Sequence, residues 1–373
     1  MAAAGGRDWV RDGEIRVGVV ADPGLPTEVA AALAGGELVQ ALAANVTGRG
    51  RWRVDVLCEA LPLDERGLVS MAELGARRRA REGWDVVIYL TDLPRRSGTR
   101  PVMADLSTGH SAALISLPAV GWVRLRRHVR DTIVWLVRRL TGKEVALQRA
   151  IGWFSIVRET GSCHPGIDVS LALVGWRGHA RLLFGMVRDN RPWRLVPHLA
   201  SATAAAAATA AFAIFYSSIW GMAEALPPWR LAVVTAGAIV AMAGWLVVYN
   251  HLWERSAAHH TPVEAVLYNA STALTLLLGV AFMYGILYVL ALAVASMVID
   301  AGYLSSQLGH PVGIGDYCTL VWLASSMGVV AGALGSSLDS EEAVRAAAYS
   351  RRERERQARH QIAVAGRDAQ GPG

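Results

Sequence analysis

Four long apolar stretches in the second half of the chain constrain its fold more than any other feature. They cover residues 199–220, 231–249, 266–299 and 317–338, and none of them contains a charged residue. A helix needs ~20 apolar residues to cross the hydrocarbon core of a bilayer, and soluble cores do not supply four such runs in succession. The sequence therefore predicts an all-α transmembrane domain over residues 198–338, with the lipid bilayer as its partner.

The arginines around these stretches predict the orientation. Three arginines lie just before the first stretch, no lysine or arginine occurs in the segment 300–316, and seven arginines follow the fourth stretch. Cytoplasmic segments of membrane proteins carry the excess of positive charge. We therefore expect a multi-pass protein of the cell membrane with four spans and with both the amino and the carboxyl terminus in the cytoplasm.

The third stretch leaves two interpretations open. Its 34 residues would form a helix of about 50 Å, which is longer than a ~30 Å hydrocarbon core. One long tilted helix is the first interpretation. Two half-helices broken at Gly285 are the second, and they would place both ends of the stretch on one side of the bilayer.

Residues 15–141 predict a cytosolic domain in which strands and helices alternate. Strands are expected at 15–21, 52–58, 85–90, 101–106 and 112–117, and helices at 26–45, 69–82 and 123–140. This alternation is typical of βαβ units with a parallel sheet covered on both faces. The predicted fold class is therefore an α/β domain with a parallel or mostly parallel sheet, Rossmann-like and three-layered.

The remaining segments complete the predicted organisation. Residues 1–14 are expected to be a disordered N-terminus, and residues 339–373 a charged cytosolic tail. Residues 142–197 predict an amphipathic connector on the membrane surface, with a helical pattern over 168–187. A helix packed on the soluble domain explains the same pattern, so both interpretations stay open.

Candidate ligand-binding residues follow the predicted strands. In an open α/β sheet, ligands bind beyond the carboxyl ends of the strands. The residues expected there, or in the loops that come next, are Asp22, Thr27, Thr91, Asp92, Arg95, Arg96, Arg100 and His110. Carboxylates, arginines and a histidine in one crevice could hold an anionic metabolite or perform acid–base chemistry. The competing interpretation is that the Asp-Pro-Gly segment and Asp92 only form turns.

Several classes of chemistry are excluded by composition. Lys143 is the only lysine, so Schiff-base and phosphate-loop mechanisms lack the residue that they need. No glycine-rich dinucleotide fingerprint occurs, and the three widely spaced cysteines match neither a disulfide framework nor a zinc site. We therefore expect no metal site, and the cofactor stays unknown. Because the arginines flank apolar stretches, we expect a membrane partner and no nucleic acid.

The apolar stretches themselves indicate packing more than transport. Gly328 and Gly332 in the fourth stretch have the spacing that lets helices approach closely, within the protein or in a homo-oligomer. No stretch contains an ionisable residue of the kind that marks ion or proton pathways. A transporter or channel is therefore the least favoured class, and the basic flanks are expected to contact anionic lipid.

Several segments resemble an uncharacterised family of actinobacterial membrane proteins. The similar segments are residues 83–94, 101–102, 110–118, 190–197, 252–255 and 267–270. The resemblance implies a soluble N-terminal α/β domain followed by about four transmembrane helices. Some relatives are labelled methylenetetrahydrofolate dehydrogenase, but the residues of this chain do not support that label. Those enzymes are soluble and rely on a lysine and a dinucleotide-binding domain, whereas the single Lys143 is misplaced.

These observations predict an architecture and leave the activity open. A ligand-binding or regulatory module in the cytosolic domain is the favoured function, because the expected crevice carries arginines and no catalytic fingerprint. The alternative is a membrane-tethered enzyme that acts on an anionic metabolite through Asp22, Asp92 and His110.

Overall fold

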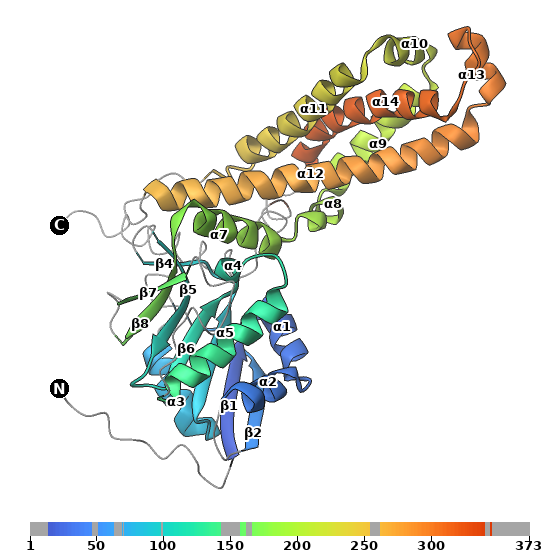
Figure 1. Ribbon diagram of the computed structural model, residues 1–373. Helices are drawn as coiled ribbons and strands as arrows, with labels where there is room; N and C mark the ends of the chain where they lie inside the picture. Colours follow the sequence, from blue (N-terminus) through green and yellow to red (C-terminus); the bar gives the residue numbers. More distant parts are fainter. Residues whose placement is uncertain are drawn as a thin grey trace, which may run out of the picture. The chain divides into compact units, whose positions relative to one another are not determined.

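The computed structural model describes residues 14–46, 51–62, 69, 71–97, 100–142, 157–161, 166–253, 262–339 and 344. These residues form two compact units that divide between Asp189 and Asn190. The first unit is an α/β domain, and the second is a bundle of helices (Figure 1).

Four parallel strands form the core of the α/β unit. They are β1 (Glu14–Ala21), β2 (Arg51–Cys58), β3 (Val86–Thr91) and β6 (Ala112–Ser116), in the order β2-β1-β3-β6. Every residue of β3 is buried, because this strand has a partner on each side and helices over both faces. The fold class predicted from the alternating pattern is confirmed for this core.

Antiparallel strands extend the sheet beyond β6. They are β5 (Arg100–Ser107), which pairs with β6, then β8 (Val169–Leu173) and β7 (Val157–Gly161), with the short β4 (Arg95–Ser97) on β5. Two predictions were wrong here. Residues 95–97 form a strand instead of a loop, and the segment predicted as one helix over 168–187 begins with β8. Part of the predicted connector thus belongs to the sheet.

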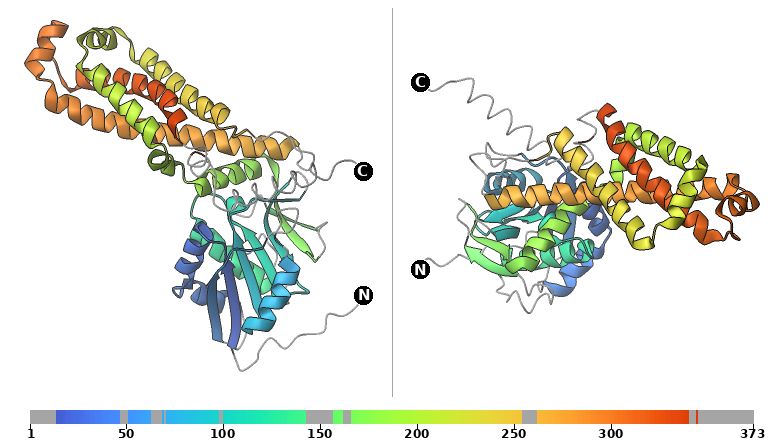
Figure 2. Two further views of the ribbon diagram at one scale, coloured as in Figure 1. Left: turned by 180° about the vertical axis from the view of Figure 1, so that it is seen from behind. Right: turned by 90° about the horizontal axis from the view of Figure 1, so that it is seen from above.

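Helices cover both faces of the parallel strands (Figure 2). The helices of this unit are α1 (Leu25–Ala34), α2 (Glu37–Asn45), α3 (Met71–Glu82), α4 (Leu117–Val120), α5 (Leu125–Leu140) and α7 (Gly175–Asn190). Helix α3 covers one face, and α1, α2 and α5 cover the other. The helix predicted over 26–45 is split in two, because Gly36 has a φ of +105° that a continuous α-helix cannot contain.

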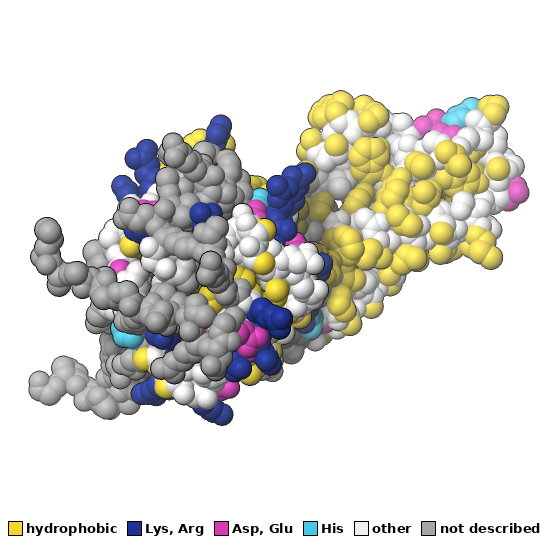
Figure 3. All heavy atoms as spheres, turned by 60° about the horizontal axis from the view of Figure 1, so that its bottom comes forward, with side chains coloured by type: hydrophobic (Ala, Val, Ile, Leu, Met, Phe, Trp, Pro, Cys, Tyr) yellow, Lys and Arg dark blue, Asp and Glu magenta, His cyan; other side chains and the backbone are white. Residues whose placement is uncertain are grey.

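The second unit consists mainly of four helices that lie alongside one another. They are α9 (Ala200–Phe215), α11 (Pro228–Tyr249), α12 (Pro262–Val298) and α14 (Ile314–Gly335). Short helices connect or extend them, namely η2 (Pro192–Arg194), α8 (Leu195–His198), α10 (Ser217–Ala225), α13 (Ala301–Leu308) and η3 (Ser336–Leu338). Figure 3 shows a mostly apolar surface on this unit, with acidic residues and histidine at its tip. His310, just after α13, has its Nε2 2.7 Å from Oε1 of Glu224 in α10.

Within the part of the chain that the structure describes, three helices are long and apolar enough to cross a membrane. They cover Pro228–Tyr249, Ala265–Val298 and Ile314–Leu338. The third predicted stretch is one continuous helix through Gly285, so the described residues favour the long helix over two half-helices. These helices fit a membrane protein.

The first predicted stretch differs from the other three. Helix α9 has 16 residues, about 24 Å, and the helical path breaks at Tyr216 before α10 begins. A fourth span is reached only if α9 and the bent helical stretch before it, Gly175–His198, count as one. The described residues therefore contain three candidate spans, or up to four if this bent pair counts as one.

Close contact between α9 and α14 organises the bundle. A Cβ atom added at Gly328 would lie 2.5 Å from the carbonyl oxygen of Ala206, and one at Gly332 would lie 2.9 Å from that of Ala202. Both distances are shorter than a Cβ atom tolerates, so any larger residue would push the two backbones apart. The glycine spacing singled out in the sequence thus lies at a helix–helix contact within the chain.

Hydrogen bonds connect the other helices to α14. The indole Nε1 of Trp322 donates to Thr235 Oγ1 of α11 at 2.7 Å. The hydroxyls of Tyr284 and Tyr288 on α12 donate to carbonyl oxygens of α14 one turn apart, at 3.3 and 3.4 Å. Polar groups in an apolar surrounding gain from such partners because no water replaces them.

Some predicted segments lie outside the described residues. They are residues 1–13, the stretch 143–156 and, apart from residues 339 and 344, the charged tail.

We predict that Gly328→Ala destabilises the bundle by about 1–3 kcal/mol, because the added methyl group overpacks the contact with Ala206. The control is Gly237→Ala in α11, where an added Cβ meets nothing within 4 Å. This change should be neutral or stabilising by up to ~1 kcal/mol. Unfolding of the purified protein in mixed micelles with increasing dodecyl sulfate measures both. Equal responses of the two variants would contradict the packing assigned to Gly328.

Candidate functional site

The strand order creates a switch point between β1 and β3. From β1 the chain passes to β2 on one side and then returns to β3 on the other. Ala21 pairs with Leu90, so the two strands are parallel neighbours, as expected from the sequence. Asp22 and Thr91 therefore follow the strands side by side at the carboxyl edge, which is where ligands bind in open α/β sheets.

Asp22 is fully buried at this edge and is held by the backbone. Its amide donates to the carbonyl of Leu90 at 3.0 Å, and its carboxylate oxygen Oδ1 accepts the amide hydrogen of Leu61 at 2.9 Å. The hydroxyl of Thr27 donates to the carbonyl oxygen of Asp22 at 2.8 Å, and it lies 3.0 Å from the sulfur of Cys58. Both predicted residues thus stabilise the turn into α1.

The neighbouring residues also form a hydrogen-bonded turn. Thr91 Oγ1 accepts the amide hydrogen of Leu93 at 3.1 Å, and Ser116 Oγ of β6 donates to the carbonyl oxygen of Leu93 at 2.7 Å. Asp92 is 7% exposed between them. The structure places Asp22, Thr91 and Asp92 at the same edge of the sheet, where the hydrogen bonds described above stabilise turns. A ligand-binding role for these three residues stays a prediction.

Arg95 has a structural partner. Its guanidinium Nε lies 2.7 Å from Asp105 Oδ2 of β5, and both side chains are buried. The other carboxylate oxygen of Asp105 accepts a hydrogen bond from Ser170 of β8 at 2.6 Å. The ion pair therefore joins three strands of the antiparallel extension.

The other predicted residues lie at two different places. Arg96 and Arg100 belong to the β4–β5 hairpin, where Arg96 pairs with Pro101 and Arg100 is exposed. His110 lies in the turn between β5 and β6, and its Nδ1 is 2.9 Å from Ser107 Oγ. Because β5 is antiparallel to β6, this turn lies at the amino edge of the parallel strands.

The predicted acid–base group is therefore not assembled in the described residues. Asp22 and Asp92 follow the carboxyl ends of β1 and β3, whereas His110 precedes β6 at the opposite edge of the sheet. A general base must lie within hydrogen-bond reach of the proton that it removes. His110 cannot act together with the two carboxylates across the length of a strand.

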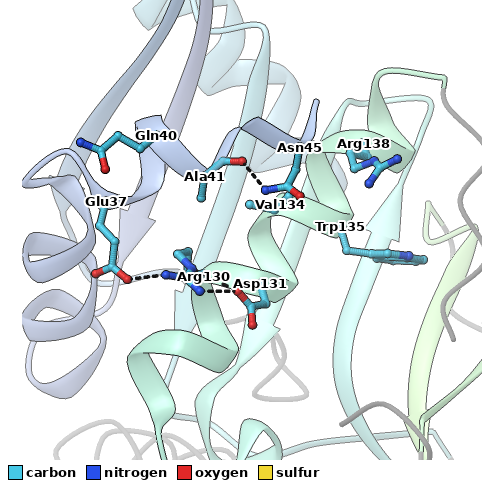
Figure 4. A pocket seen from close by; sticks show the side chains of 9 residues that line it. All are labelled: Glu37, Gln40, Ala41, Asn45, Arg130, Asp131, Val134, Trp135 and Arg138. Atoms are coloured by element: carbon cyan, nitrogen blue, oxygen red, sulfur yellow. Dashed lines mark hydrogen bonds and ion pairs between the residues drawn. The ribbon is translucent and has the colours of Figure 1, made fainter. Parts of the chain in front are cut away.

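A pocket of about 380 Å³ opens on the same unit between α2 and α5 (Figure 4). This volume falls in the range of small-molecule sites. The lining residues are Glu37, Gln40, Ala41 and Asn45 of α2 and Arg130, Asp131, Val134, Trp135 and Arg138 of α5. The helices are amphipathic, and their polar faces meet here because their apolar faces pack on the sheet.

One end of the pocket contains a compact group of charges. Arg130 lies 2.7 Å from Glu37 Oε1 and 2.9 Å from Asp131 Oδ1. Burial lowers the pKa of Arg130, but its hydrogen bonds to Asp131 and Glu37 outweigh that effect and raise the pKa overall. The guanidinium therefore stays charged, and the two carboxylates are neutralised only in part.

The other end of the pocket contains Arg138. Its Nε is buried and has no hydrogen-bond partner among the residues that the structure describes. The Asn45 amide lies between the two ends, where it donates to the Ala41 carbonyl at 2.8 Å (Figure 4). The side chain of Trp135 extends to the opposite side of α5 from Arg130. Arg138 is therefore the lining side chain best suited to pair with a negatively charged group of a ligand.

Sequence reasoning missed this pocket. The basic character of α5 was visible, but its pairing with α2, about ninety residues earlier in the chain, depends on both helices covering the same face of the sheet. A signal was present in Arg130, Val134 and Arg138, which recur at helical spacing on one side of α5.

Comparisons with known proteins do not assign this chain to a family. No protein-family model, no curated protein and no solved structure gives a significant match to this chain. The resemblance to actinobacterial membrane proteins therefore depends on the quoted segments alone. Among the described residues, no group of three or more His, Cys, Asp or Glu side chains could hold a metal ion.

We predict that Arg95→Ala destabilises the α/β unit by about 3–5 kcal/mol, because it leaves the buried carboxylate of Asp105 without its partner. Arg100→Ala in the same hairpin is the control and should change stability by less than about 0.5 kcal/mol. Chemical unfolding of the full chain in detergent, followed by tryptophan fluorescence, compares the two.

A double variant, Arg95→Met with Asp105→Asn, should recover most of the lost stability. No charge then remains buried, and the amide oxygen introduced at position 105 can still accept the hydrogen bond from Ser170. If Arg95→Ala leaves unfolding unchanged, the ion pair is not structural and Arg95 becomes a ligand-binding candidate again.

Proposed function

We propose that the protein is a membrane-integrated binding module. Its α/β unit takes a small polar ligand with one negatively charged group, and its apolar helices hold that unit at the bilayer. The observation that supports this proposal best is the pocket between α2 and α5, in which the buried Nε of Arg138 lacks a partner among the described residues. A buried donor of this kind gains free energy from an anionic acceptor.

The charge pattern of the pocket limits the ligand. Two carboxylates and two guanidinium groups line it, so the lining as a whole is neutral. At the other end, Arg130 is already paired with Glu37, so this end offers no free positive charge to a second anionic group. A ligand with a single carboxylate or phosphate at the Arg138 end therefore fits better than a polyanion. Gln40 and Asn45 provide amide groups for uncharged polar parts of the ligand.

Binding is favoured over catalysis because the geometry separates the residues that an acid–base reaction would need. His110 lies at one edge of the sheet, and the carboxylates of Asp22 and Asp92 follow the other edge. The described lining of the pocket contains no serine, cysteine, histidine or lysine, and both of its carboxylates are paired with Arg130, which makes them weaker nucleophiles and bases.

We predict that Arg138→Gln weakens ligand binding by about 10- to 150-fold, which corresponds to a charge-assisted hydrogen bond of ~1.5–3 kcal/mol. The matched control is Arg139→Gln, which removes the same charge from the next position of α5, outside the pocket lining. The measurement is thermal stabilisation of the full chain in detergent by a panel of small carboxylates and phosphate esters, followed by calorimetry. Equal loss of affinity in both variants would show only a general charge effect.

The sidedness of the membrane unit is part of the same proposal. An arginine-free segment at 300–316 and an arginine-rich tail support an extracytoplasmic position for the former and a cytoplasmic one for the latter. We predict that Gln307→Cys, an exposed position in α13, reacts with an impermeant thiol reagent in intact cells, in a background that lacks the three native cysteines. Ser350→Cys in the tail should not react. The reverse pattern would contradict the proposed orientation.

A further inference from the structure

An exposed apolar surface lies on the α/β unit where the turn before α5 meets α7. The side chains of Trp122, Val123 and Phe184 are 61%, 51% and 43% exposed. The ring centres of Trp122 and Phe184 are 5.9 Å apart, so the turn and the helix form one continuous surface. Together with Trp176, which is 76% exposed on α7, these residues are called the apolar patch.

Arginines surround the patch. Arg124 and Arg126 follow Trp122 closely in the chain and are exposed. The guanidinium carbon of Arg177 lies 5.8 Å from the ring centre of Trp176. At ~100° per residue, Trp176, Arg177 and Phe184 fall within an arc of about 100° on α7. Gly178, Leu182 and Gly185 lie on the other, buried side of that helix.

The patch is built on a rigid base. A Cβ atom added at Gly185 would clash with the carbonyl oxygen of Pro118, so α7 rests directly on α4. Arg181 of α7 donates through Nε to the Val120 carbonyl at 2.8 Å, and its Nη2 lies 3.3 Å from His128 Nδ1. Burial and the charge of Arg181 lower the pKa of His128 to about 4, so the imidazole is neutral near pH 7 and can accept this hydrogen bond.

The backbone conformation also fixes the tip of the turn before α5. Arg124 has a φ of +50°, a left-handed backbone conformation that residues other than glycine rarely adopt. This conformation directs the chain so that Trp122 and Val123 are exposed, while Leu125 begins α5 in the core. Exposure of two apolar side chains at a strained, well-packed turn indicates that a partner covers them.

Chain continuity points to the bilayer as that partner. Helix α7 ends at Asn190, and α9 of the apolar bundle begins ten residues later at Ala200. Ten residues span at most ~35 Å, so a short stretch of chain tethers α7, which carries Trp176 and Phe184, to the apolar unit. Such a tether gives a high effective concentration of bilayer surface around the patch.

We propose that the apolar patch docks on the surface of a bilayer that contains anionic lipid. Tryptophan and phenylalanine side chains enter the interfacial region, and Arg124, Arg126 and Arg177 contact lipid phosphates. This proposal rests on membrane integration, which the Gln307→Cys labelling tests separately. A second copy of the chain fits less well, because a two-fold contact through the patch would bring the same arginines against one another.

The test uses the full chain in lipid vesicles. A Val123→Cys variant in a cysteine-free background is labelled with an environment-sensitive nitrobenzoxadiazole dye, and quenching by lipids that carry a doxyl group near the headgroup is measured. Vesicles of phosphatidylcholine are compared with vesicles that also contain phosphatidylglycerol. We expect strong lipid quenching in the anionic vesicles. The control is the same dye at Ala43→Cys, an exposed position of α2, where lipid quenching should be absent.

Two further variants separate the contributions. Arg124→Gln with Arg126→Gln should lower the docking equilibrium constant in anionic vesicles by roughly 25-fold, since each arginine adds ~1 kcal/mol at such a surface and 1.4 kcal/mol is tenfold. Trp122→Ser with Phe184→Ser should abolish quenching of the dye at position 123. Quenching that persists in this variant would show that the dye itself drives insertion, and the proposal would be overturned.

Two other results would also overturn it. In the first, iodide in the aqueous phase quenches the dye at position 123 and doxyl lipid does not, in both types of vesicle. Alternatively, energy transfer between labelled copies could rise with protein density while lipid quenching stays absent, which would identify a second copy as the partner.

Discussion

The bundle depends on the close approach of α9 and α14. In lipid, helices gain little from burying apolar side chains, so van der Waals contact between backbones has to supply much of the association energy. Gly328 and Gly332 allow α14 to lie against the carbonyl groups of Ala202 and Ala206. This contact also explains why α9 consists so largely of alanine, because any larger side chain on the facing side would separate the two helices. The remaining helices then attach to α14 through the hydroxyl groups of Thr235, Tyr284 and Tyr288.

The α/β unit uses its buried charges mainly for structure. Asp22 accepts from the backbone at the end of β1, and Asp105 pairs with Arg95 across the antiparallel strands. Removing one member of such a pair leaves an uncompensated charge, so these residues are costly to change whatever the ligand is. The groups that we propose for recognition lie elsewhere, in the pocket between α2 and α5 and in the arginines around the apolar patch. The two surfaces have different chemistry, since one encloses a small volume and the other is an open face.

Particular residues show where sequence reasoning succeeded and where it failed. The strand at Val86–Thr91 was identifiable because an almost fully apolar run indicates a strand buried on both faces. Val169–Leu173 was mistaken for helix because a five-residue apolar run fits either period and an amphipathic helix follows it. His110 was placed at the wrong edge because the connection from β5 to β6 was treated as part of a parallel sheet. That connection has only four residues, whereas a parallel crossover needs a dozen or more, so its length already indicated an antiparallel pair.

The sequence by itself determined the division into an α/β part and an apolar helical part, the parallel core and the continuous span candidates. Each of these follows from a local pattern of apolar residues. Such residues avoid water and favour a protein core or a hydrocarbon phase wherever they occur in the chain. Only the tertiary structure decided which charged residues meet. The partner of Arg95 is Asp105, and the partner of Arg130 is Glu37. Ion pairs and pockets form between segments that are distant in the chain, and a sequence carries no local signal for the register and crossing that bring them together.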